Sequence, residues 1–294
     1  MTKDQLLRGR WAFLGLAIGG GVTLYTMQRY AAPKKNGPHL IRLTPSSFDQ
    51  YTVETQVDGR KYSLIFDTGC SSVVLRDTTA YSSSIQPDLH KNQIRISNLN
   101  VSLGTFSRTV ETIFIQNMPS TVKDGLLGNL AFAPSEDGKV MGKRITLRFY
   151  KDSLEINDDP SRPRYKPEIN ALRLEVRPIK IEYGAPDISY VTEIKVDDHR
   201  SVSAIVDTGA HGDLTLPDSF QNYNPKWIVA PDQIPSHVIP IKNPAILHLS
   251  DRSFPINVSL EKTIRRPVIG ARFLKQFKVT WDFRDNEMYL EKPD

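Results

Sequence analysis

The chain has 294 residues, an ordinary globular composition and a formal net charge of +5 at pH 7. Residues 1–42 hold seven lysines and arginines against one aspartate, so this segment carries +6 and the remaining body −1. A nearly neutral body argues against a nucleic-acid-binding domain, which needs basic charge clustered on its folded surface. The single cysteine, Cys70, excludes an intrachain disulfide.

The first predicted element is a membrane helix. Trp11–Met27 is an uncharged apolar run with basic residues on both sides, at the short end of the length that spans a bilayer. A cleaved signal peptide is the alternative, although Ala31-Ala32 before Pro33 is a poor cleavage site. We therefore expect a tail at 1–10, a transmembrane helix at 11–28 and a linker at 29–44, giving a single-pass membrane protein. Similar numbers of basic residues on the two sides leave its orientation and its membrane open.

The remainder of the chain contains two copies of one pattern. In each copy an apolar run leads directly into Asp-Thr-Gly, first at Leu64–Gly69 and again at Ala204–Gly209, and the two aspartates are 140 residues apart. An apolar-apolar-glycine motif follows each copy, at Leu126–Gly128 and Val268–Gly270, with the glycines 142 residues apart. Landmarks that keep their spacing so closely indicate a duplicated fold.

Strand patterns dominate both copies. Alternating or β-branched runs such as Tyr51–Val57 and Tyr190–Val196 are bounded by turn residues. Helix patterns are few and short, at Leu130–Phe132 and Ala271–Phe277. The sequence predicts an all-β protein of two pseudo-symmetric, barrel-like lobes with one short helix each. The lobes are expected at 45–158 and 172–294, joined by a proline-rich connection at 159–171.

The two aspartates are the candidate catalytic residues. A carboxylate at the end of a buried strand is costly unless it is paired or hydrogen-bonded. Two such carboxylates in one duplicated chain indicate that Asp67 and Asp207 face each other and share a proton.

Together these motifs resemble the pepsin/retropepsin superfamily of aspartic proteases, over roughly residues 45–292. The resemblance implies a bilobal aspartic-protease fold in which Asp67 and Asp207 hold a catalytic water. It implies that Thr68 and Thr208 bind across to the opposite lobe. It also implies that Gly69 and Gly209 permit the tight turns, and that Gly128 and Gly270 are structural residues beneath the dyad. The strands around Asp282-Phe283 and Met288–Leu290 resemble the pair that ends the C-terminal lobe.

The chain departs from the family pattern in two places. Cys70 and Ala210 stand where pepsin-like enzymes usually have serine or threonine, and alanine is the usual retropepsin residue. A flap tyrosine is absent between Ser82 and Thr112, and Ser82–Gln93 contains no glycine. These features favour a compact, single-chain version of a retropepsin, with flap residues that the sequence does not identify.

The sequence therefore predicts a membrane-anchored aspartic endopeptidase that acts on extended polypeptides as a monomeric catalytic unit, with no cofactor and no metal. None of the histidines has metal-ligand spacing. Cys70 is interpreted as a small packed residue and His211 as a surface or subsite residue. The alternative hypothesis is a weakly active or inactive protease-fold scaffold that binds extended peptides at a membrane.

Overall fold

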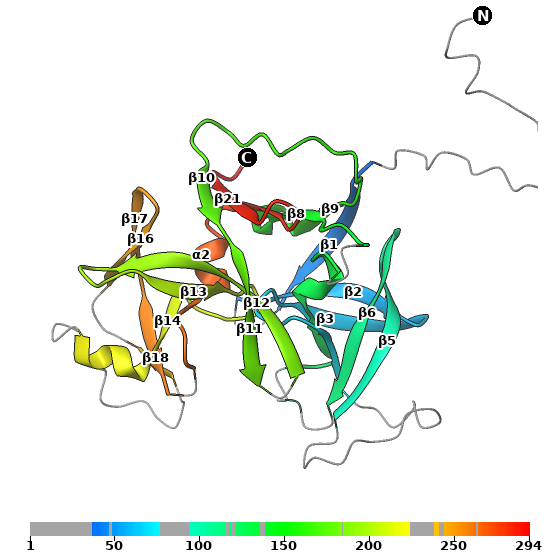
Figure 1. Ribbon diagram of the computed structural model, residues 1–294, viewed down its shortest axis with the longest axis horizontal. Coiled ribbons are helices and arrows are strands. Elements are labelled where there is room, and N and C mark those ends of the chain that lie inside the picture. Colours follow the sequence, from blue (N-terminus) through cyan, green and yellow to red (C-terminus); the bar gives the residue numbers. More distant parts are fainter. Residues whose placement is uncertain are drawn as a thin grey trace, which may run out of the picture. The chain divides into compact units, whose positions relative to one another are not determined.

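The computed structural model describes residues 37–46, 49–76, 94–115, 118, 122–135, 139–183, 185–223, 238–240, 244–262 and 264–294 (Figure 1). All of them belong to one compact unit, Asn36–Asp294. The expected tail, the membrane helix and residues 29–36 of the expected linker lie outside the described residues, as do residues 82–93 of the region 82–112 where a flap is expected. Residues 39–44 of the expected linker are instead part of a strand, which begins at His39 because alternate residues from there on are buried against the core. Within the described residues, no helix has the length and apolar character needed to cross a bilayer.

The fold is all-β and is built on two barrel-like sheets. The first has twelve strands in the order β10-β21-β20-β8-β9-β1-β2-β3-β7-β4-β6-β5. Its strands are β1 (His39–Pro45), β2 (Tyr51–Val57), β3 (Arg60–Phe66), β4 (Val73–Arg76), β5 (Ile94–Leu103), β6 (Phe106–Ile115), β7 (Gly125–Leu127), β8 (Arg144–Arg148), β9 (Ser153–Asn157), β10 (Leu172–Glu175), β20 (Lys278–Asp282) and β21 (Glu287–Glu291).

The second sheet has nine strands, in the order β15-β18-β14-β19-β13-β12-β16-β17, with β11 also paired to β12. Its strands are β11 (Arg177–Tyr183), β12 (Ala185–Val196), β13 (Val202–Val206), β14 (Leu214–Pro217), β15 (Val238–Pro240), β16 (Ala245–Leu249), β17 (Arg252–Ile256), β18 (Val258–Glu261) and β19 (Val268–Ile269).

The strand pairing repeats between the two sheets, as the duplicated sequence pattern predicts. In the first sheet β3 runs parallel to β7, β7 antiparallel to β4, and β4 parallel to β6. In the second sheet β13, β19, β14 and β18 pair in the same senses and the same order. Phe66 pairs with Leu127 and Val206 with Ile269, so the sequence spacings of 140 and 142 residues are also the spacings of paired positions.

The last two strands of the chain pair with strands on both sides of the expected lobe boundary. β20 is antiparallel to β8, and β21 is antiparallel to β10, so the twelve-stranded sheet crosses the expected lobe boundary at residue 172. Every residue of β20 is buried, because both faces of this strand are covered. Trp281 stacks on Phe283 with ring centroids 4.9 Å apart, and Tyr190 of β12 packs edge-on against both rings. This aromatic core joins the two halves.

The helices are short, and there are more of them than the sequence predicts. The expected helices appear as the 3-10 turn η1 (Asn129–Ala131) and as α2 (Ala271–Leu274). Two further 3-10 turns, η2 (Phe149–Lys151) and η3 (Asp218–Tyr223), correct the expectation of one short helix per lobe. A three-residue turn such as η2 carries no helical periodicity in its sequence. It is ended by Asp152, whose φ of 46° places it in the left-handed region.

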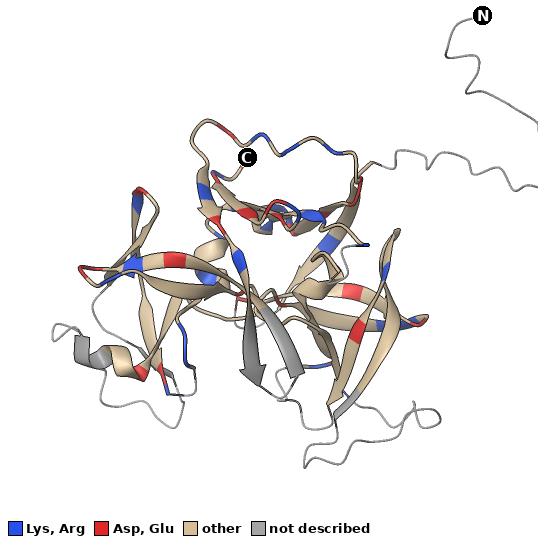
Figure 2. Cartoon of the chain, viewed as in Figure 1, with Lys and Arg blue, Asp and Glu red and all other residues tan. Residues whose placement is uncertain are grey.

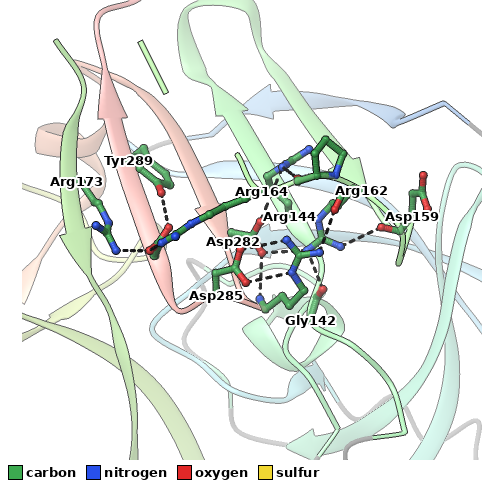
Figure 3. A network of polar contacts seen from close by, with 12 residues as sticks. Gly142, Arg144, Asp159, Arg162, Arg164, Arg173, Asp282, Asp285 and Tyr289 are labelled. Atoms are coloured by element: carbon green, nitrogen blue, oxygen red, sulfur yellow. Dashed lines mark hydrogen bonds and ion pairs between the residues drawn. The ribbon is translucent and has the colours of Figure 1, made fainter. Parts of the chain in front are cut away.

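Ion pairs hold the connection between the two halves in place. Arg162 Nη2 lies 2.9 Å from Asp282 Oδ1 of β20, and both side chains are almost fully buried. Arg164, from the connection, and Arg173 of β10 both bind Glu287, whose other carboxylate oxygen accepts the Tyr289 hydroxyl (Figure 3). Basic and acidic residues are interspersed along this part of the chain (Figure 2). The connection is therefore held against the β20–β21 hairpin rather than left as a free linker.

Candidate active site

The two aspartates occupy matching positions at the ends of β3 and β13. The Asp67 N–H donates to the Leu127 carbonyl at 3.0 Å, and the Asp207 N–H donates to the Ile269 carbonyl at 2.9 Å. Each aspartate thus leaves its strand just after a parallel pairing with the apolar-apolar-glycine motif. The buried runs Leu64–Phe66 and Ala204–Val206 anchor these strands, with only Ile205 partly exposed.

The structure brings Thr68 and Thr208 together. The N–H of each threonine donates to the hydroxyl of the other at 3.1 Å. The Thr68 hydroxyl then donates to the Val206 carbonyl at 2.9 Å, and the Thr208 hydroxyl donates to the Phe66 carbonyl at 2.8 Å. Both threonines are at most 3 % exposed. These four reciprocal bonds lock the two aspartate loops to each other.

Gly69 and Gly209 allow the carboxylates to approach the opposite loop. A Cβ built on Gly209 would lie 2.5 Å from Asp67 Cγ, and one built on Gly69 would overlap the Asp207 carboxylate. Backbone N–H groups also bind the carboxylates. Cys70 N donates to Asp67 Oδ1 at 2.9 Å, and Gly209 N donates to Asp207 Oδ1 at 2.7 Å. The Gly69 N–H reaches Asp207 Oδ1 at 3.3 Å. Any side chain at either glycine would push the carboxylates apart.

The environment raises the pKa of Asp67 well above its ordinary value. Burial is the largest cause, followed by the negative charge of Asp207 and a hydrogen bond between the two carboxyl groups. The N–H groups of Cys70 and Gly69 oppose this rise because they stabilise the ionised form. Both aspartates nevertheless keep part of their surface open to solvent. A pair of this kind retains one proton between two carboxyl groups and titrates as a unit.

Gly128 and Gly270 lie directly beneath the aspartate loops. A Cβ on Gly128 would overlap the carbonyls of Ser71 and Ser72, and one on Gly270 would lie 2.5 Å from the Gly212 carbonyl. The residues that follow them bind the same loops, since Asn129 N donates to Cys70 O at 2.9 Å and Ala271 N donates to Ala210 O at 2.7 Å. Both glycines therefore support the loops without reaching the carboxylates.

Three residues that the sequence reasoning missed also hold the site. Gln50 Nε2 donates to the Gly209 carbonyl, and Ser189 Oγ donates to the Gly69 carbonyl at 2.9 Å, so each half reaches the loop of the other. Asn129 Nδ2 donates to the Thr68 carbonyl at 3.2 Å. Gln50 and Ser189 precede the two equivalent strand patterns at Tyr51 and Tyr190. A polar residue repeated at that point was the available signal.

The remaining candidates lie to the side of the dyad. The Cys70 thiol is partly buried and donates to the Ser72 carbonyl at 3.3 Å. His211 is exposed. Among the residues that the structure describes, no group of three or more His, Cys, Asp or Glu side chains could hold a metal ion.

No protein-family model matches this sequence, and no curated protein matches it. The site consists of two carboxyl groups that approach each other, presented by equivalent strands of a repeated β unit and held together by paired threonines.

Proposed function

We propose that this chain is an aspartic endopeptidase with a bilobal aspartic-protease fold, which hydrolyses peptide bonds with a water held between Asp67 and Asp207. The observation that carries the proposal is the contact between two carboxyl groups of which Asp67 has a strongly raised pKa. Such a pair offers a base and an acid side by side, which is what attack by water on an amide requires. One chain supplies both groups, so the proposed catalytic unit is a monomer.

In the proposed mechanism one carboxyl group of the pair is protonated and the other is ionised. The raised pKa of Asp67 favours Asp67 as the protonated partner. As the water oxygen attacks the scissile carbonyl carbon, Asp207 takes a proton from the water and Asp67 donates its proton to the carbonyl oxygen. In the resulting tetrahedral diol, Asp207 passes its proton to the amide nitrogen and the carbon–nitrogen bond breaks. One diol hydroxyl then returns its proton to Asp67 as the carboxylic acid forms, which regenerates the starting state.

The proposal includes an extended polypeptide as substrate and a membrane anchor at residues 11–28. Extended chains are bound mainly through their backbone, with side-chain pockets adding specificity.

Cleavage of a peptide library by the full-length chain in detergent, between pH 3 and pH 8, tests the proposal. We expect Asp67→Asn and Asp207→Asn to lower kcat/KM by about 10³-fold or more, because each removes a proton-transfer group. Asp251→Asn, at an exposed turn between β16 and β17, is the matched control and keeps full activity. Binding of a non-cleavable hydroxyl-bearing peptide isostere without cleavage at any pH would reject the enzyme in favour of a peptide-binding scaffold.

A further inference from the structure

A serine from the C-terminal half contacts the loop that carries Asp67. Ser189 lies in β12, its side chain is fully buried, and its Oγ donates to the Gly69 carbonyl at 2.9 Å. That carbonyl belongs to the same peptide group as the N–H of Cys70. The Cys70 N–H donates to Asp67 Oδ1 at 2.9 Å. Ser189, one peptide group and the Asp67 carboxylate therefore form a continuous chain of two hydrogen bonds.

Hydrogen bonds in such a chain reinforce each other. A donor at the carbonyl oxygen draws electron density through the peptide group and makes its N–H a stronger donor. The same bond holds the peptide plane in the orientation that points the Cys70 N–H at Asp67. Both effects favour the ionised form of that carboxyl group, because an N–H donor stabilises a carboxylate more than a neutral acid.

We propose that Ser189 is a positioning residue that sets the acidity of Asp67 through the Gly69–Cys70 peptide group. The inference deepens the proposed function, on which it rests in so far as Asp67 is the catalytic acid. An acid that must donate its proton to the substrate and later recover it needs a tuned proton affinity. Burial and the neighbouring carboxylate raise that affinity, and the chain of bonds from Ser189 limits the rise.

The groups around Asp67 allow this chain of hydrogen bonds a measurable effect on the pKa of Asp67. Within the part of the chain that the structure describes, the charge that acts on Asp67 is the Asp207 carboxylate, and the N–H groups of Cys70 and Gly69 stabilise the ionised form of Asp67. The Cys70 thiol donates away from the dyad, to the Ser72 carbonyl.

The second loop is built differently. Its carbonyl at Gly209 accepts Gln50 Nε2, but the N–H groups that the structure shows on Asp207 are those of Gly69 and Gly209. The peptide group whose carbonyl accepts the Gln50 hydrogen bond is therefore not a peptide group whose N–H binds Asp207. The hydrogen bonding around the two aspartates thus differs between the two halves.

The test is the titration of the dyad in the full-length chain, followed by the ¹³C shift of the Asp67 carboxyl carbon and, in parallel, by the pH dependence of peptide cleavage. We expect Ser189→Ala to move the upper apparent pKa of the pair upward by about half a unit. The alkaline limb of kcat should move with it, while KM changes little. Ser189→Thr, which keeps the hydroxyl, should restore the wild-type titration.

Ser259→Ala is the matched control. It removes a serine hydroxyl that lies 3.1 Å from Thr215 Oγ1, away from the aspartate loops, and it should leave the titration unchanged. Thermal unfolding of each variant shows whether a change in the titration reflects misfolding or an altered pKa of Asp67. An Asp67 titration that is identical in wild type and Ser189→Ala, or equally shifted in Ser189→Thr, overturns the inference. A wild-type chain that cleaves no peptide overturns the proposed function instead, and the ¹³C titration still decides the role of Ser189.

Discussion

Replacing Thr68 by valine should destabilise the whole fold, because it removes one hydroxyl from the reciprocal threonine bonds. Valine keeps the shape of threonine but loses the donor to the Val206 carbonyl and the acceptor for the Thr208 N–H. Both partner groups would remain buried without a hydrogen bond, at about 1–3 kcal/mol each. We therefore expect the free energy of unfolding to fall by about 2–6 kcal/mol.

Urea unfolding of the full-length chain, followed by tryptophan fluorescence, measures this loss. Thr146→Val is the control, since the Thr146 hydroxyl shares a single 3.1 Å bond with the Thr280 hydroxyl in an equally buried position. That change leaves one partner without this bond rather than two, so it should cost about 1–3 kcal/mol. The double variant of Thr68 and Thr208 should cost less than the sum of the single changes, because the two residues share bonds. A loss for Thr68→Val no larger than for Thr146→Val would refute the reasoning.

Three further changes test other parts of the structure. Gly209→Ala should abolish cleavage while the chain still folds, because the new Cβ displaces the Asp67 carboxyl; circular dichroism and a cleavage assay decide this, and an active variant contradicts it. Burial raises the pKa of Glu287, but hydrogen bonds from a tyrosine and an arginine outweigh it and hold the pKa below its ordinary 4.5. Its ionised form therefore stabilises the fold above that pH, and this stability is lost as the pH falls further. Glu287→Gln should accordingly lower the melting temperature at pH 7 and flatten its decline in acid. Arg162→Met should cost about 3–5 kcal/mol in urea unfolding, because it removes the buried 2.9 Å ion pair of Asp282 and leaves that carboxylate with the longer 3.9 Å contact to Arg144 and the Arg284 N–H. Adding Asp282→Leu should recover part of that loss.

The pair of aspartates could be predicted because the residues that position each aspartate lie next to it in the sequence. A buried run that ends in Asp-Thr-Gly fixes where the chain turns, and the repeated spacing places the second turn opposite the first. The structure brings together Asp67, Asp207 and the two threonines in this way. The membrane helix stays a prediction because it falls outside the described residues, and so does the part of the expected flap region at 82–93.

The contacts made across the fold could not be predicted in the same way. β20 pairs with β8 although about 130 residues separate them, and strand patterns alone do not choose a partner among many similar strands. The repeated polar position points to Ser189, but the sequence does not identify its partner, because the Gly69 carbonyl lies 120 residues away in the chain. The 3-10 turns η2 and η3 were missed because such short turns show no clear helical periodicity in their sequence.

The pairing of β20 and β21 with β8 and β10 has a consequence for how the protein is made. The first sheet stays incomplete until residues 278–291 have left the ribosome, because these strands lie between β8 and β10. Contacts this distant in sequence form slowly. Folding of the first sheet is therefore finished only after translation has passed β21, whereas the second sheet takes all its strands from residues 177–269.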